Sequence, residues 1–94
     1  MYTVVFEPAG FRLFKKLPKP TKAVISHQAE KLKTEPLSGE PLKGKYRQYR
    51  SLHFSHRGIA YRIIYQVFEA SQTVYVRLAD KRENIYKRLE HMEG

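Results

Sequence analysis

Arginine, histidine and tyrosine side chains occur together in the second half of the chain, and these residue types handle phosphate groups. Arg62 lies in the middle of the run Gly58–Phe68, with His53 before it and Arg82 and Tyr86 after it. A guanidinium stabilises negative charge on phosphate oxygens, and an imidazole exchanges protons near neutral pH because its unperturbed pKa is about 6.5. The pattern indicates phosphate chemistry carried out by side chains on a rigid platform.

Further basic residues lie on the same part of the chain. Seven of them are candidates for contacts with a nucleic-acid backbone: Lys43, Lys45, Arg47, Arg50, His56, Arg57 and Lys81. Arg and Lys neutralise phosphates, while Tyr and His stack on unpaired bases, so this mixture on a sheet suits single-stranded RNA better than duplex DNA. The chain also has 18 Lys and Arg against 9 Asp and Glu, a formal charge of +9 that attracts polyanions.

RNA carries its own nucleophile, the 2′-hydroxyl group. A protein that cleaves RNA therefore needs only in-line positioning, charge stabilisation and proton transfer, without a metal or cofactor. Arginine stays protonated and cannot act as a base. Proton transfer is left to His53, His56, Tyr86 or a lysine, and we take His53 as the first candidate.

Several other classes of chemistry lack their parts. The sequence has no nucleophilic triad, no Gly-rich phosphate loop and no carboxylate pair of catalytic spacing. It has no Cys, and its four His are too scattered to suggest a metal cluster. The amino terminus does not resemble a signal peptide, and no apolar run approaches the roughly 18 residues of a membrane span, so we expect a soluble, cytoplasmic protein with no membrane partner.

The central element must be the strand that holds Arg62. Residues 58–68 are rich in β-branched and aromatic side chains, which favours a strand. Strand alternation places Tyr61, Ile63, Tyr65 and Val67 on one face and Arg62, Ile64 and Gln66 on the other. We expect the first face to be core and the second to present the guanidinium, although an exposed arginine on a sheet is also ordinary.

The remaining elements follow from hydrophobic spacing. We predict a strand at Tyr2–Phe6, a helix from Pro8 that ends at Pro18–Pro20, a second helix that Pro36 stops, and a loop at residues 35–45. Strands at Tyr46–Phe54 and Thr73–Ala79 flank the central strand, and a short helix spans Arg82–Met92. The order predicts one α+β domain over residues 1–94, with a helical hairpin on a mainly antiparallel four-stranded sheet.

Two motifs together resemble those of a known family. The run Tyr61-Arg62-Ile63-Ile64-Tyr65, preceded by the Pro41–Gly44 loop and followed after one more strand by Arg82-Glu83-Asn84-Ile85-Tyr86, is similar to the RelE/ParE family of bacterial and archaeal toxins. The resemblance spans the whole chain. It implies a microbial-ribonuclease-like fold and, for the RelE branch, an endoribonuclease that cuts mRNA in the ribosomal A site and is silenced by a cognate acidic antitoxin.

The resemblance also implies roles for particular residues. Arg62 matches the sheet arginine that contacts the scissile phosphate, Arg82 the second phosphate-stabilising arginine, and Tyr86 the tyrosine that orients the substrate or stacks on it. RelE-like enzymes can carry lysines at outward positions of the preceding strand, where this chain has Ser51 and His53. Two alternatives therefore stay open: a ParE-like inhibitor of DNA gyrase, and an RNA- or ribosome-binding module without catalysis.

Overall fold

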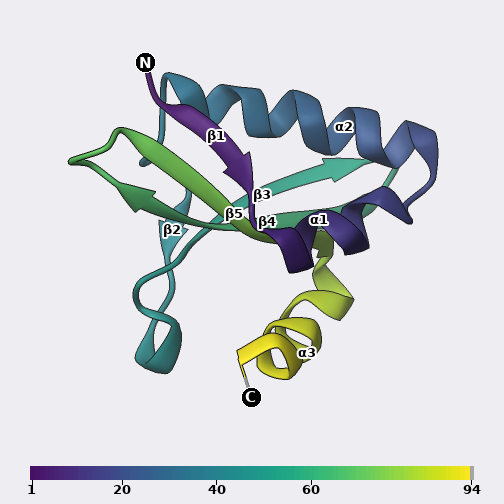
Figure 1. Ribbon diagram of the computed structural model, residues 1–94. Coiled ribbons are helices and arrows are strands. Elements are labelled where there is room, and N and C mark those ends of the chain that lie inside the picture. Colours follow the sequence, from purple (N-terminus) through teal and green to yellow (C-terminus); the bar gives the residue numbers. More distant parts are fainter. Residues whose placement is uncertain (94) are drawn as a thin grey trace.

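A mixed five-stranded sheet forms the centre of the molecule (Figure 1). The computed structural model describes residues 1–93. The strands are β1 (Thr3–Phe6), β2 (Glu40–Pro41), β3 (Arg50–His56), β4 (Ile59–Phe68) and β5 (Thr73–Lys81). They are arranged in the order β1-β5-β4-β3-β2, and β1 runs parallel to β5 while the other neighbours are antiparallel. The longest strand, β4, is therefore central and bonded on both sides.

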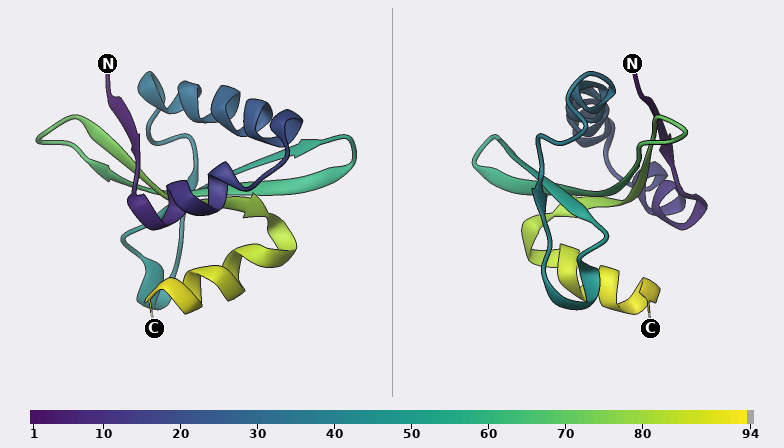
Figure 2. Two further views of the ribbon diagram at one scale, coloured as in Figure 1. Left: turned by 45° about the vertical axis from the view of Figure 1, so that its right-hand side comes forward. Right: turned by 90° about the vertical axis from the view of Figure 1, so that its left-hand side faces the viewer.

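Helices cover both faces of this sheet. They are α1 (Pro8–Lys15), α2 (Lys19–Glu30) and α3 (Arg82–Glu93). Figure 2 shows α2 crossing one face and α3 lying against the opposite one. Pro8 and Pro20 occupy the first turns of α1 and α2, where a missing backbone N–H costs no intrahelical hydrogen bond. None of these helices is long and apolar enough to cross a membrane.

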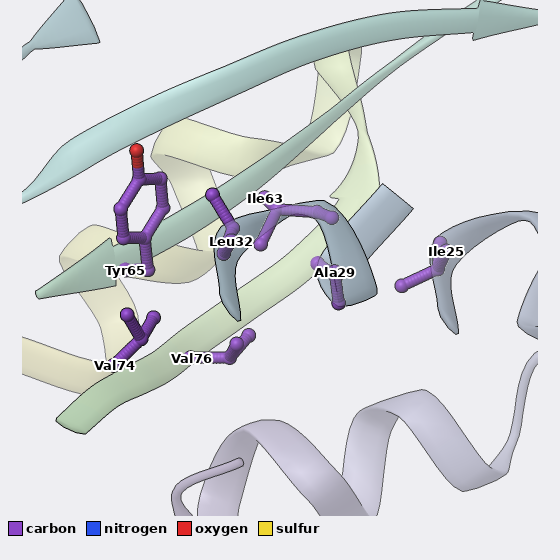
Figure 3. Close-up of a cluster of buried hydrophobic side chains, with 8 residues drawn as sticks. Ile25, Ala29, Leu32, Ile63, Tyr65, Val74 and Val76 are labelled. Carbon is purple, nitrogen blue, oxygen red and sulfur yellow. The ribbon is translucent and has the colours of Figure 1, made fainter. Parts of the chain in front are cut away.

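The larger hydrophobic cluster lies between α2 and the sheet (Figure 3). Its members come from α2 and the 3-10 turn after it, from β4 and from β5: Ile25, Ala29, Leu32, Ile63, Tyr65, Val74, Val76 and Ala79. The hydroxyl of Tyr65 accepts the backbone N–H of Gly39 at 2.8 Å, so this buried tyrosine also holds the loop before β2. This face is the core that the alternation of the central strand predicts.

A second cluster lies on the opposite face, under α3. It consists of Tyr49, Ile64, Leu78, Ile85 and Leu89. The expectation that only one face of the central strand is core is therefore wrong at Ile64, because α3 packs against the second face of the sheet and covers this residue. Arg62 lies on this same face, beside the covered region.

The α+β architecture and the helical hairpin are confirmed, with two differences on one side of the sheet. Five strands replace the predicted four, because Glu40 and Pro41 pair with Ser51 and Arg50 at the edge of β3. The strand predicted at Tyr46–Phe54 begins only at Arg50. The residues before it form tight turns, in which the N–H of Tyr49 donates to the carbonyl oxygen of Tyr46 at 2.9 Å.

Two local irregularities shape the sheet. Arg57 and Gly58 have φ values of 52° and 79°, as a two-residue type I′ turn between β3 and β4 requires. In β5 the register jumps, since Ile64 pairs with Leu78 and Tyr65 with Val76. Arg77 is the extra residue of this bulge, and bulges of this kind redirect a side chain.

Candidate active site

A hydrogen bond joins the central strand to the helix that follows the sheet. Arg62 Nη1 donates to the hydroxyl oxygen of Tyr86 at 2.9 Å. The guanidinium carbon lies 5.6 Å from the centre of the Tyr86 ring. This contact uses one of the five N–H donors of an arginine, so the others remain able to bind an anion.

His53 lies directly opposite Arg62. The two residues are register partners on β3 and β4, and partners across antiparallel strands project from the same face of a sheet. Burial lowers the pKa of His53 below its usual 6.5, with Arg62 and Arg82 acting in the same direction and Glu40 opposing them. The imidazole is therefore mainly neutral at neutral pH, the form in which one ring nitrogen accepts a proton.

A pocket opens at this position. It has a volume of about 280 Å³ and is lined by His53, Phe54, Ser55, Ala60, Tyr61, Arg62 and Arg82. A second pocket of about 590 Å³ adjoins it at the hairpin end, sharing Ala60 and Arg82 and lined also by Gly58, Ile59, Lys81 and Glu83. Arg82, the first residue of α3, thus borders both spaces with its exposed side chain. A polyanionic strand that lay across both pockets would meet two arginines and a histidine.

Asp80 completes the surroundings of Arg62 from the other side. It is the register partner of Arg62 on β5 and is 6% exposed. Its carboxylate accepts the N–H of Lys81 at 2.7 Å and pairs with Arg88 Nε at 2.5 Å. The acidic neighbour of the site is therefore already neutralised from α3.

The four residues predicted to be catalytic lie together. Arg62 bonds Tyr86, His53 faces Arg62 across the strands, and Arg82 borders the same pocket. These positions come from three elements, β3, β4 and α3. Proximity of these side chains is what the chemistry requires, and their roles remain predictions.

Three of the predicted RNA contacts lie on the opposite face of the sheet. Arg50, His56 and Lys81 pair with Tyr65, Ile59 and Tyr61, all of which alternate away from Arg62. Arg50 is also engaged in the fold, because its Nε donates to the carbonyl oxygen of Gly39 at 3.0 Å. Of the three, only Lys81 borders one of the two pockets, at the hairpin end.

The other predicted contacts are on turns. Arg57 occupies the exposed tip of the β3–β4 hairpin. Lys43, Lys45 and Arg47 lie in the loop after β2, not on the central hairpin, and this loop projects beside the C-terminal end of α3 (Figure 1). None of the four lines the pocket around Arg62. All four are exposed cations that lie outside this pocket.

Sequence reasoning missed Asp80 and Arg88 as parts of this site. The signal for Asp80 was its place directly after the strand in which Val74, Val76 and Leu78 alternate. Arg88 had no comparable signal, because its partner is set by the path of α3 beneath the sheet. Within residues 1–93, no group of three or more His, Asp or Glu side chains is placed to hold a metal ion.

The chain is similar to known toxins in sequence and in structure. The family model of the ParE-like toxin of type II bacterial toxin-antitoxin systems matches residues 4–90. The toxin–antitoxin complex RelBE2 of Mycobacterium tuberculosis contains a chain with 32% identity and a TM-score of 0.73, over 86% of this chain and 91% of that one. No curated protein matches the sequence significantly.

Two structures of Escherichia coli RelE share the fold at lower identity. A double mutant in the free state has 18% identity and a TM-score of 0.73, over 98% of this chain and 95% of that one. The isolated toxin has 18% identity and a TM-score of 0.71 over the full length of both chains. The architecture described above is therefore the RelE architecture.

Proposed function

The chain belongs to the RelE/ParE family of type II toxin–antitoxin toxins, and from this premise we propose that it is an endoribonuclease that cuts mRNA in the ribosomal A site. The observation that carries the proposal is the Arg62–Tyr86 hydrogen bond with His53 opposite Arg62. In this cluster Arg62 can bind a phosphate, Tyr86 can stack on a base and His53 can accept a proton, all on the same side of the sheet. A toxin that acted only by binding a protein would not need that combination.

The proposed reaction uses the nucleophile of the substrate. The 2′-hydroxyl oxygen attacks the adjacent phosphorus while the neutral imidazole of His53 takes its proton. The bond from phosphorus to the 5′ oxygen breaks, the 5′ oxygen takes a proton from water, and a 2′,3′-cyclic phosphate or its hydrolysed product remains. Arg62 and Arg82 stabilise the extra negative charge of the transition state. Tyr86 is 43% exposed; it orients Arg62 and offers its ring to a base.

An acidic antitoxin is the proposed protein partner. The chain's relative from M. tuberculosis was solved in complex with its antitoxin. A formal charge of +9 favours an acidic partner and accelerates its association at low salt. Because the proposed substrate is translated mRNA, the proposed location is the cytoplasm.

Primer extension on a reporter mRNA after induction tests the proposal. We expect new 5′ ends within translated codons for the parental chain and none for Arg62→Ala. Lys87→Ala, which removes an exposed cation of α3, should cleave like the parent. Intact mRNA during growth arrest would contradict the proposal.

Inhibition of DNA gyrase is the second candidate, favoured by the ParE-like description of the matching family. A supercoiling assay with purified gyrase separates the two candidates. Loss of supercoiling with intact mRNA would replace the proposed nuclease by the gyrase inhibitor. Arrested growth with neither effect, unchanged in Arg62→Ala, would indicate a binding module without catalysis.

A further inference from the structure

Asp80 is a buried carboxylate placed directly across from the central arginine of the site. Asp80 and Arg62 are register partners on β5 and β4, so their side chains leave the same face of the sheet. A buried carboxylate is costly unless a cation and hydrogen bonds satisfy it. By position alone, Arg62 is a natural partner for Asp80.

The structure pairs Asp80 with a different arginine. Arg88 reaches it from α3 with Nε 2.5 Å from Oδ2, while the backbone of Lys81 donates to Oδ1 at 2.7 Å. Arg62 instead donates to the hydroxyl of Tyr86 at 2.9 Å. In the described part of the chain, Arg62 has no carboxylate within salt-bridge distance, so its positive charge is available to a ligand.

We propose that Arg88 is a positioning residue that occupies the Asp80 carboxylate and thereby keeps Arg62 free for Tyr86 and for the phosphate. The effect on cleavage rests on the proposed function, whereas the choice of partner by Asp80 does not. Without Arg88, the buried carboxylate of Asp80 would be left without a cation. The guanidinium of Arg62 lies opposite Asp80 and would then pair with it. Pairing with Asp80 would neutralise Arg62 and draw it away from Tyr86.

The position of Arg88 suits this role. It lies two residues after Tyr86 on α3, so a single helix carries both the partner of Arg62 and the competitor for Asp80. The Arg88 side chain is 43% exposed, while that of Asp80 is 8% exposed. Removal of Arg88 therefore leaves little apolar space unfilled and chiefly changes the charge balance at Asp80.

The first experiment is an NMR titration of His53 in the free protein. Burial lowers the pKa of His53, Arg62 and Arg82 lower it further, and Glu40 raises it. In Arg88→Ala we expect this pKa to rise, because Asp80 neutralises Arg62. In the double variant Asp80→Asn with Arg88→Ala, we expect it to return to the parental value. This measurement needs no nuclease activity.

The second experiment is single-turnover cleavage of mRNA on ribosomes. We expect Arg88→Ala to lose about 10–100-fold in rate, by analogy with the loss when a residue that orients a metal ligand is removed. The double variant should recover most of the activity, and Arg88→Lys, which keeps a cation for Asp80, should retain most of it. If Arg88→Ala is too unstable to measure, Arg88→Met carries the same expectations because it keeps the apolar stem.

Lys87→Ala is the matched control, since it removes one exposed positive charge from the same helix without touching Asp80. It should leave both the His53 titration and the cleavage rate unchanged. Parental behaviour of Arg88→Ala would overturn the proposal, as would a loss that Asp80→Asn does not reverse. If the parental chain cleaves nothing but the His53 titration follows the expected pattern, the proposed function fails and the pairing of Asp80 stands.

Discussion

Two arginines on neighbouring strands, Arg62 and Arg77, both reach toward α3 and have opposite surroundings. Arg77 pairs with Glu7 at 2.7 Å and with Glu93 at 3.2 Å, and its side chain is 17% exposed. Arg62 has one protein contact in the site, the neutral hydroxyl of Tyr86. The charge of Arg77 is thus balanced by two carboxylates. The charge of Arg62 is not balanced by any carboxylate in the described part of the chain.

The difference shows how one helix serves two purposes. At its C-terminal end α3 is held by Arg77 and by the hydroxyl of Tyr49, which donates to Glu93. Burial and this hydrogen bond raise the pKa of Tyr49 to about 12, so the hydroxyl keeps its proton across the physiological range. At its N-terminal end α3 presents Arg82 to open pockets. Because these contacts hold the C-terminal end of α3, Arg82 at its N-terminal end can stay exposed.

The largest expected effect is a loss of cleavage at the pocket around Arg62. His53→Gln keeps a polar side chain on β3 but cannot accept the 2′-hydroxyl proton, so single-turnover cleavage should fall by about 10²–10⁴. The pKa of His53 is lowered from 6.5, so the parental rate should rise with pH in the acidic range and level off before neutrality. That rise should flatten in the variant. Parental cleavage with the parental pH profile would remove His53 from the mechanism.

A slightly smaller effect distinguishes the two arginines directly. Arg62→Ala should reduce cleavage by about 10²–10³, the loss of one preorganised donor to transition-state charge, and Arg82→Ala should do the same. The urea midpoint of Arg62→Ala should change little, because its one contact in the site is a neutral hydroxyl. A large loss of stability in Arg62→Ala would break the comparison.

Arg77→Ala should show the reverse pattern. We expect the free energy of unfolding to fall by roughly 1.5–3 kcal/mol, the range for hydrogen bonds to charged groups. Urea denaturation measures this loss, and Lys33→Ala, which breaks the exposed Lys33–Glu30 pair, should change stability by less than about 1 kcal/mol. Folded Arg77→Ala should cleave at nearly the parental rate. A stable but inactive Arg77→Ala would show that the fixed end of α3 takes part in the chemistry.

The smallest expected effect is at the hairpin tip. Arg57→Ala removes one cation outside the pocket of Arg62, so binding should weaken and the salt dependence of binding should lose a slope of about 1. The cleavage step of bound complexes should stay unchanged. Affinity measured at several salt concentrations tests this, and a salt slope equal to the parental one would exclude contact between Arg57 and the RNA backbone.

Local patterns were sufficient to predict most of the fold. The central strand and the helix starts near prolines are set by neighbouring residues, so they could be predicted from the sequence alone. The strand β2 was missed because its two residues are strand only through their pairing with β3. The strand β3 was predicted to begin at Tyr46 but begins at Arg50. Tyr46 and Tyr49 are not part of it and pack beside α3 instead.

The residues of the candidate site could be predicted where the family resemblance or strand alternation pointed to them. Contacts between elements that are distant in the sequence could not be predicted. Arg62, Arg82, Tyr86 and His53 were named and lie together, while their roles stay predictions. The second face of the central strand was predicted to be more exposed than it is, because no residue near Ile64 in the sequence shows that α3 covers it. Spacing likewise cannot show which arginine a buried aspartate selects.

The parallel pairing of β1 with β5 has a consequence for how the chain folds. It joins Thr3 to Thr73, whereas β3, β4 and β5 are joined through short turns. Closing a long loop costs more chain entropy than forming a hairpin, so we expect the three antiparallel strands to form the folding nucleus and β1 to dock late. A Val4→Ala variant should then unfold faster while its folding rate stays nearly parental. The first strand to be synthesised would be the last to join the sheet.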